Sequence, residues 1–196
     1  MNIIFDFDGT IAYSFDYVLQ FLVEEAKRKT PLSDEERTTL QGIAMATMAR
    51  RLRVPVWKLP FLFWKGRRRM GERMSTVQPF PGIKETVSKL YADGHHLYVV
   101  SSNSVQNIQT FLENHGMDKY FIKLYSGGFG FFGKAEVIRR VLRHNGLDAR
   151  ETFYIGDEGR DIKAAKRAGI RIVAVDWGYS SHEALERLSQ PEPPSP

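Results

Sequence analysis

Short apolar runs alternate along the chain with segments whose apolar residues recur at helical spacing. The runs expected to form strands are 3–5, 97–100, 121–125, 152–155 and 170–175. One-sided helical patterns follow the second, third and fourth of these runs. Because near-continuous apolar strands that alternate with helices are typical of parallel sheets covered on both faces, we expect an α/β fold with a three-layer Rossmann-like core.

Residues 13–79 interrupt this rhythm. A helix is predicted over 15–29, and Ser33 is a candidate N-cap for a second helix. No convincing strand occurs before Pro79, where the alternating pattern resumes. We therefore predict a core formed by residues 1–12 and 80–189, with a small all-helical cap over 13–79 inserted after the first strand. The proline-rich segment 190–196 is predicted to be a disordered tail.

Acidic residues gather where two predicted strands end, which is where parallel α/β sheets bind ligands. Asp6 and Asp8 follow the first strand, and Asp157 and Asp161 follow the fourth. Because positions i and i+2 of an extended chain face the same way, Asp6 and Asp8 are expected to project into one site. If the two strands are neighbours, all these acids converge. Such a cluster favours a hard cation with oxygen ligands, and Mg²⁺, which often also binds a substrate phosphate, is the natural choice.

Two further segments complement the acids. Residues 101–104 offer hydroxyl, amide and helix N-terminal N–H groups, which together suit an anion. Lys134 follows the glycine-rich stretch 127–130 and lies near a helix start, where its charge can offset that of a phosphate. Each signal is common alone, as a loop, a helix cap or a solvated lysine. Their order at successive strand ends is what favours phosphate chemistry.

This ordered set of motifs resembles the haloacid dehalogenase-like (HAD) superfamily, and most closely its phosphoglycolate phosphatase-like branch, which has a helical cap after the first motif. The motifs are Asp6-Phe7-Asp8-Gly9-Thr10, Ser101, Lys134 and Gly156-Asp157-Glu158-Gly159-Arg160-Asp161. They cover the core, roughly residues 1–12 and 80–182. The resemblance implies a Mg²⁺-dependent phosphatase that hydrolyses a small phosphate monoester through an aspartyl-phosphate intermediate.

The resemblance also implies roles for the matching residues. Asp6 would be the nucleophile and Asp8 the general acid and base. Mg²⁺ would be bound by the Asp6 carboxylate, the Asp8 backbone carbonyl and Asp157, with Asp161 binding directly or through water.

The remaining matches concern the phosphate. The resemblance implies that Ser101 hydrogen-bonds the phosphoryl oxygens and that Lys134 neutralises charge. The further candidates for substrate or phosphate binding are Gly9, Thr10, Ser102 and Asn103.

The chain departs from the family pattern at two positions. Tyr13 stands where relatives commonly carry an acid, and Glu158 stands where a small hydroxyl residue is frequent, so Glu158 could compete as a metal ligand. The family's dehalogenases lack an acid two residues after the nucleophile. Asp8 therefore favours phosphoryl transfer over dehalogenation.

Composition narrows the class of protein further. The 196 residues, 42% hydrophobic and 26% charged, suit one domain or a core with an insert. The absence of cysteine excludes disulfides, thiolate catalysis and cysteine-based metal sites. We expect a cytoplasmic protein without a membrane span, because the start lacks a basic signal-peptide segment and no apolar stretch approaches the length of about 18 residues that spans a bilayer.

The net charge of +5 is unevenly distributed. Residues 50–73 hold nine Lys or Arg against one acid, a net +8, so the remainder carries −3. Trp57, Phe61, Phe63 and Trp64 interleave with these cations. The favoured interpretation is helix core or a dimer interface with a solvated basic face, in a monomer or homodimer. A small anionic substrate ranks second, and nucleic acid or a membrane surface third.

Two alternative functions remain. On the same core, a phosphomutase would pass the phosphoryl group from the aspartate to another sugar hydroxyl. A catalytically silent binding module would instead use the basic cap to dock RNA or a protein. The complete set of acids argues against the silent module.

Overall fold

A single parallel sheet forms the centre of the computed structural model, which describes residues 1–41, 43, 45–127 and 133–189. The strand order is β3-β2-β1-β4-β5, and each neighbouring pair is parallel. The strands are β1 (Asn2–Phe5), β2 (His96–Ser101), β3 (Phe121–Ser126), β4 (Thr152–Gly156) and β5 (Arg171–Ala174). The predicted strands and the α/β class are confirmed, with boundaries that move by at most one residue.

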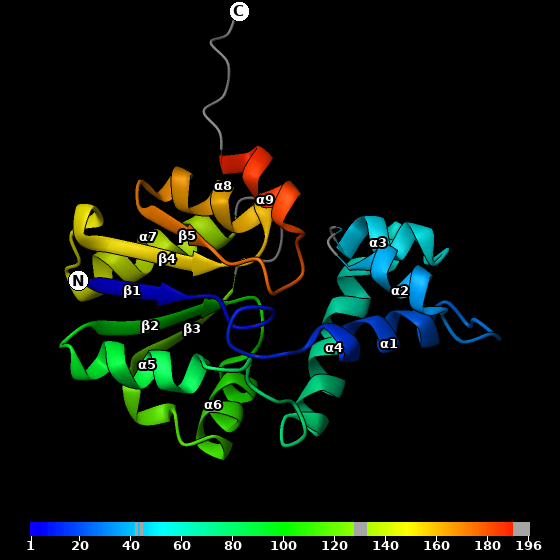
Figure 1. Ribbon diagram of the computed structural model, residues 1–196, viewed down its shortest axis with the longest axis horizontal. Helices are drawn as coiled ribbons and strands as arrows, with labels where there is room; N and C mark the ends of the chain where they lie inside the picture. Colours follow the sequence, from blue (N-terminus) through cyan, green and yellow to red (C-terminus); the bar gives the residue numbers. More distant parts are fainter. Residues whose placement is uncertain (42, 44, 128–132, 190–196) are drawn as a thin grey trace, which may run out of the picture.

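Helices cover both faces of the sheet (Figure 1). On one face lie α5 (Ile83–Ala92) and α6 (Val105–Asn114), and on the other α7 (Gly133–Asn145) and α8 (Gly159–Ala168). Side chains of successive residues in β1 point to opposite faces of the sheet. Ile3 and Phe5 pack with α5 and α6, whereas Ile4 packs with α7 and α8. Both faces of the strand are therefore buried, which explains its unbroken apolar run.

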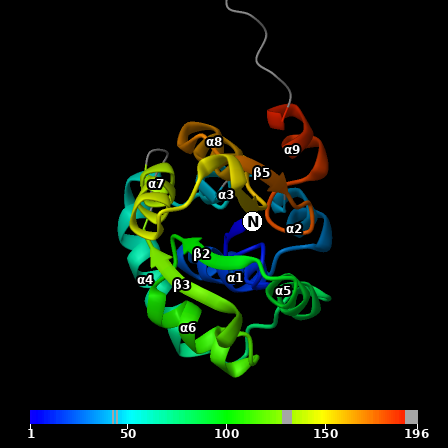
Figure 2. The same ribbon diagram turned by 90° about the vertical axis from the view of Figure 1, so that its left-hand side faces the viewer.

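Shorter elements complete the core. Two 3-10 helices, η2 (Asp118–Tyr120) and η3 (Ala149–Glu151), lead into β3 and β4. The last described helix, α9 (His182–Ser189), packs beside α8 (Figure 2). Sequence patterns predicted neither α5 nor α9. Figure 1 shows that the strand arrows of β1 and β4 point toward the helices of the insert, so the carboxyl ends of the strands face that insert.

The insert between β1 and β2 is entirely helical among its described residues. It contains α1 (Phe15–Glu25), α2 (Asp34–Leu40), α3 (Met45–Arg51), the 3-10 helix η1 (Val56–Lys58) and α4 (Leu59–Arg73). These helices bury a cluster of their own, to which Leu19, Leu22, Met48 and Leu62 belong. The predicted small helical cap inserted after the first strand is thereby confirmed as part of the fold.

Local chemistry explains how the insert's helices begin and end. Ser33 caps α2, because its hydroxyl accepts the Glu36 N–H at 3.1 Å while the Glu36 carboxylate accepts the Ser33 N–H at 2.9 Å. The predicted helix over 15–29 is too long, since α1 ends at Glu25 and Lys27 adopts a φ of 52°. That left-handed conformation cannot continue a right-handed helix.

Two predictions fall outside the described residues: the proline-rich tail, and most of the glycine-rich stretch 127–130. Within the described part of the chain, no helix is long and apolar enough to cross a membrane.

Candidate active site

The neighbouring strands β1 and β4 end at the same edge of the sheet and bring their acidic residues together there. Phe5 of β1 is in register with Ile155 of β4, and the Asp6 N–H donates to the Ile155 carbonyl at 2.8 Å. Asp6 and Asp157 therefore leave the sheet at the same edge, and the first turn of α8 adds Asp161. All three carboxylates are buried, and each offers an oxygen within 4.8 Å of the others.

Lys134, in the first turn of α7, is the cation of this cluster. Its Nζ donates to Asp6 Oδ2 at 2.7 Å and to Asp161 Oδ1 at 2.5 Å, and the residue is only 3% exposed. Burial alone would lower the pKa of Lys134, but the Asp161 and Asp6 carboxylates outweigh it and hold that pKa above its ordinary value. Lys134 is therefore charged and sits between two of the three acids.

One ammonium does not neutralise three buried carboxylates. Burial, aided by the Asp161 charge, raises the pKa of Asp6 to about 7 even though Lys134 opposes the shift. Burial and the neighbouring acids, Glu158 first, raise the pKa of Asp157 well above its ordinary value. Three close, buried carboxylates, with raised pKa values at Asp6 and Asp157, fit a hard divalent cation such as Mg²⁺.

The surrounding backbone is shaped around the Asp157 carboxylate. Its Oδ1 accepts the Thr10 hydroxyl at 2.9 Å, and its Oδ2 accepts the Tyr179 N–H at 2.7 Å. A Cβ added at Gly9 or Gly178 would lie 2.2 or 2.3 Å from Asp157 Oδ2, and Gly9 also has a φ of 81°. The two candidate phosphate contacts, Gly9 and Thr10, thus hold a carboxylate in place.

The Asp8 side chain is placed differently from the other three acids. The metal-binding group within the described residues is formed by Asp6, Asp157 and Asp161, and it does not include the Asp8 side chain. Asp8 instead lines a cavity between the insert and the strand ends.

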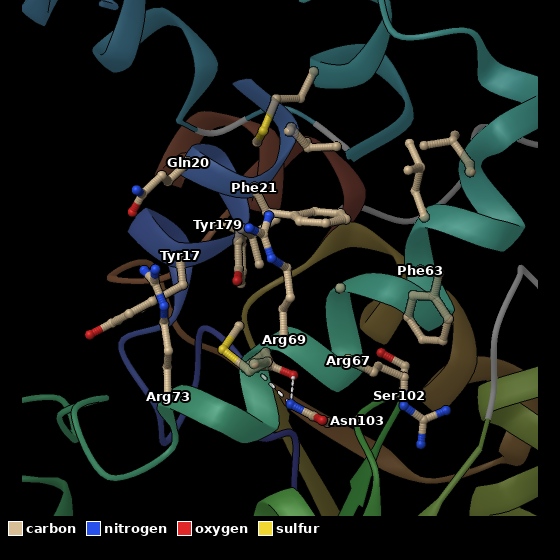
Figure 3. Close-up of a pocket in the computed structure, with 18 of the residues that line it drawn as sticks. Tyr17, Gln20, Phe21, Phe63, Arg67, Arg69, Arg73, Ser102, Asn103 and Tyr179 are labelled. Atoms are coloured by element: carbon tan, nitrogen blue, oxygen red, sulfur yellow. Dashed lines mark hydrogen bonds between the residues drawn. The ribbon is translucent and has the colours of Figure 1, made fainter. Parts of the chain in front are cut away.

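That cavity has a volume of about 200 Å³ and a mainly apolar lining from α1 and α4. Asp8, Ser102 and Asn103 supply polar groups from the strand ends. The Asn103 amide donates to Asp8 Oδ2 at 3.1 Å, a contact drawn in Figure 3. Burial raises the pKa of Asp8, while hydrogen bonds from Ser14 and Asn103 oppose the shift. Asp8 therefore holds a proton more readily than an exposed aspartate does.

Ser101 lies at the end of β2, beside β1. It is buried, and its hydroxyl accepts the Asn103 N–H at 3.0 Å. Glu158 is not part of the metal-binding group either, because its carboxylate accepts a bond from Arg160 Nη2 at 2.5 Å. This contact argues against Glu158 as a competing metal ligand.

Sequence reasoning missed several residues of the site. Arg67 of α4 reaches from the insert to the core, where its Nη2 donates to the Ser126 hydroxyl at 3.0 Å. Arg160 also lines the cavity, and its Nε is a buried donor without a hydrogen-bond partner among the described residues. Tyr179 packs in the insert's cluster, and its hydroxyl lies 2.9 Å from that of Ser14. Arg67 belongs to the basic segment 50–73 and Arg160 to the acidic motif 156–161, so both carried a sequence signal, whereas the signal for Tyr179 is its position just after the fifth strand.

The raised pKa of Asp6 predicts a pH dependence of stability that can be measured without substrate. In chelator-treated protein, the unfolded state ionises Asp6 near 3.8 and the folded state near 7. The contribution of Asp6 to the free energy of unfolding is therefore highest below about pH 4, where Asp6 is neutral in both states. It falls as the pH rises toward 7, because Asp6 ionises more easily in the unfolded state. We expect wild type to lose several kcal/mol relative to Asp6→Asn across this window, because one pKa unit is about 1.4 kcal/mol. Parallel urea-unfolding stabilities of the two proteins at every pH would contradict the shift.

Comparison with known proteins places this geometry in a family. Residues 3–175 match the model of the haloacid dehalogenase-like hydrolases. The chain is 30% identical over 185 residues to a phosphoglycolate phosphatase of Synechococcus elongatus, covering 93% of this chain and 87% of that protein. A 5'-nucleotidase of Pseudomonas aeruginosa is 32% identical over 114 residues, but only 57% of this chain and 51% of that protein are covered.

Solved structures agree on the fold. A haloacid dehalogenase-like family hydrolase from Streptococcus pneumoniae superposes with a TM-score of 0.77, at 21% identity, over 96% of this chain and 90% of that chain. The resemblance predicted from the sequence motifs is thus confirmed. The chain belongs to the haloacid dehalogenase-like hydrolase family and is similar to its phosphoglycolate phosphatases.

Proposed function

We propose that this hydrolase is a Mg²⁺-dependent phosphatase that cleaves a small phosphate monoester through a phosphoryl group carried on Asp6. One observation carries the proposal. A buried cluster of Asp6, Asp157 and Asp161 with Lys134 adjoins a cavity that Asp8 lines. The similarity over most of its length to a phosphoglycolate phosphatase supports this class of reaction.

The metal would be held by the carboxylates of Asp6 and Asp157, with Asp161 as a direct or water-mediated ligand and the Asp8 carbonyl as a further oxygen. When bound, Mg²⁺ would supply charge neutralisation for the carboxylates and for the phosphoryl oxygens. Lys134 is already shared between Asp6 and Asp161. The partly buried guanidinium of Arg160, whose charge also acts on these two acids, is paired with Glu158.

Asp6 is placed to act as the nucleophile. Its Oδ2 is held by Lys134, and its Oδ1 accepts the Phe7 N–H at 2.8 Å, so the carboxylate has a fixed orientation. In the proposed reaction an Asp6 oxygen attacks phosphorus and the bond to the leaving oxygen breaks. Water then attacks the resulting aspartyl phosphate, which releases phosphate and restores the carboxylate.

Asp8 is the proposed general acid and base. Its raised pKa suits a group that gives a proton to the leaving oxygen and then takes one from the attacking water. Asn103 orients this carboxylate by hydrogen bonding. Ser101 and Ser102, which lie at the same strand end, are the proposed hydrogen-bond donors to the phosphoryl oxygens.

Residues 13–79 are the proposed cap that selects the substrate and limits access of water. The cavity of about 200 Å³ suits a small leaving group, and Arg67 and Arg160 favour one that carries negative charge. Phosphoglycolate is therefore the first substrate to test.

Removal of the metal is expected to abolish phosphate release. Without a divalent cation, about half of the Asp6 carboxyls would be protonated at pH 7, because burial raises their pKa to about 7, and the phosphoryl oxygens would lack the neutralising charge of the metal. We expect chelated protein to lose at least about 100-fold in kcat/KM for its best substrate and to regain it with Mg²⁺. The assay follows phosphate release from phosphoglycolate, sugar phosphates, nucleotides and an aryl phosphate.

Two results of this assay would require a different function to be proposed. Undiminished release after chelation would contradict the metal requirement. Phosphate transfer to an added sugar, in place of release, would favour a phosphomutase.

A further inference from the structure

Three large aromatic side chains lie on one exposed line along α4 and the preceding turn. Trp57, Phe61 and Trp64 are 78%, 61% and 61% exposed, and exposed Arg68 continues the line. The spacings of three and four residues place Phe61, Trp64 and Arg68 on one face of α4, and Trp57 precedes them in η1, four residues before Phe61. We call these four residues the aromatic stripe. Single exposed aromatics are ordinary on protein surfaces, but a contiguous row of them marks an interaction site.

The stripe lies on neither of the two faces by which α4 contacts the rest of the protein, one packed inside the insert and one lining the cavity. Leu62 and Met70 are buried, and a Cβ added at Gly66 would lie 3.2 Å from the Phe21 ring of α1. Phe63 and Arg67 face the cavity of the candidate active site (Figure 3). At about 3.6 residues per turn, the stripe lies on the side of the helix opposite to Leu62, Gly66 and Met70. The presence of these exposed aromatic residues is therefore explained neither by packing within the insert nor by contact with the active site.

The positive charge near the stripe indicates which kind of partner could bind there. Residues 50–73 carry a net +8, and Lys58 lies over the Trp57 ring, with Nζ 5.3 Å from the centroid. Within the described part of the chain, Lys58 and Arg68 form no ion pair, whereas Lys65 and Arg69 are paired with acids of α1. A second copy of the same face would bring cations against cations, so the stripe fits a negatively charged partner better than itself.

We propose that the aromatic stripe is a docking surface for an anionic lipid membrane. Trp and Phe side chains on a convex helix face suit the headgroup region, and flanking Lys and Arg bind anionic lipids. Single-stranded RNA is a poorer fit, because such proteins usually hold the strand in a groove, and the residues that line the cavity are others. Docking through the stripe leaves the cavity uncovered, so the hydrolase can act while bound.

Co-sedimentation of the full chain with vesicles tests the proposal. We expect binding to phosphatidylcholine vesicles that contain phosphatidylglycerol, and weak binding to pure phosphatidylcholine. The double variants Trp57→Ser/Trp64→Ser and Lys58→Gln/Arg68→Gln should each lower the partition coefficient at least about tenfold. The matched controls, Tyr91→Ser and Lys89→Gln, remove an exposed aromatic and an exposed cation from α5 and should bind as wild type does.

A second readout does not depend on affinity alone. In Trp177→Phe protein the remaining indoles are those of the stripe, so their fluorescence should shift to the blue on anionic vesicles. The proposal is overturned if vesicles do not bind, or if the stripe variants bind them as tightly as wild type does. Binding of RNA, or dimerisation that is lost in the stripe variants, with no binding to vesicles, would overturn it equally. None of these outcomes depends on whether the chain hydrolyses phosphate esters.

Discussion

Asp6→Asn is expected to eliminate turnover while the protein stays folded. Asparagine has nearly the same shape, so it can still accept the Phe7 N–H, but its amide is not a nucleophile toward phosphorus. Because removal of a covalent nucleophile leaves only binding and electrostatic contributions, we expect kcat to fall at least about 10⁴-fold. Phosphate release at saturating substrate and Mg²⁺ measures this directly.

A matched control separates the loss of the nucleophile from a general effect of the substitution. Asp93→Asn makes the same change in an exposed aspartate, which pairs with Lys89 on α5 far from the strand ends. This variant should retain wild-type kcat. Near-normal turnover by folded Asp6→Asn protein would refute the role of Asp6.

Lys134→Met is expected to damage both stability and activity. Lys134 is the ammonium that contacts the Asp6 and Asp161 carboxylates, and all three groups are nearly inaccessible to solvent. Methionine fills a similar volume but leaves two buried carboxylates without their cation, a loss that typically costs about 3–5 kcal/mol. We also expect kcat/KM to fall at least about 100-fold, because the charge next to the transferring group disappears.

The comparison protein for this variant is Lys89→Met, which removes an exposed lysine from an i,i+4 pair and should change stability by less than about 1 kcal/mol. Chelator should magnify the difference between wild type and Lys134→Met, because a bound cation would otherwise share the neutralising role. If chelated Lys134→Met protein unfolds at the same urea concentration as chelated wild type, the buried ion pairs of Lys134 do not stabilise the fold.

Part of this site followed directly from local patterns. The apolar run before Asp6 and the one before Asp157 predicted parallel strands, and parallel strands end at the same edge of a sheet. Asp161 was expected at the same strand end as Asp157, and the structure places it in the first turn of α8. These inferences needed no knowledge of tertiary contacts beyond strand adjacency. The Asp8 side chain is not part of that group of carboxylates, and strand periodicity could not show this, because β1 ends at Phe5.

Other parts of the site depend on contacts between distant segments. The need for glycine at Gly178 arises only because the loop after β5 crosses Asp157. Tyr179 becomes important because it joins Asp157 to the helical insert. Arg67 reaches Ser126 across the boundary between insert and core. No periodicity or motif of a single sequence encodes these pairings, since each depends on how the insert sits on the strand ends.

The identity of the phosphoryl carrier is the central claim, and acid-quenched turnover tests it most directly. Wild-type protein would be mixed with its best substrate and Mg²⁺, quenched in acid at successive times and digested for mass spectrometry. The account predicts a phosphoryl group on the peptide that contains Asp6, which is removed by neutral hydroxylamine and absent from Asp6→Asn protein. A phosphoryl group on a different residue, or continued phosphate release by Asp6→Asn at the wild-type rate, would contradict it.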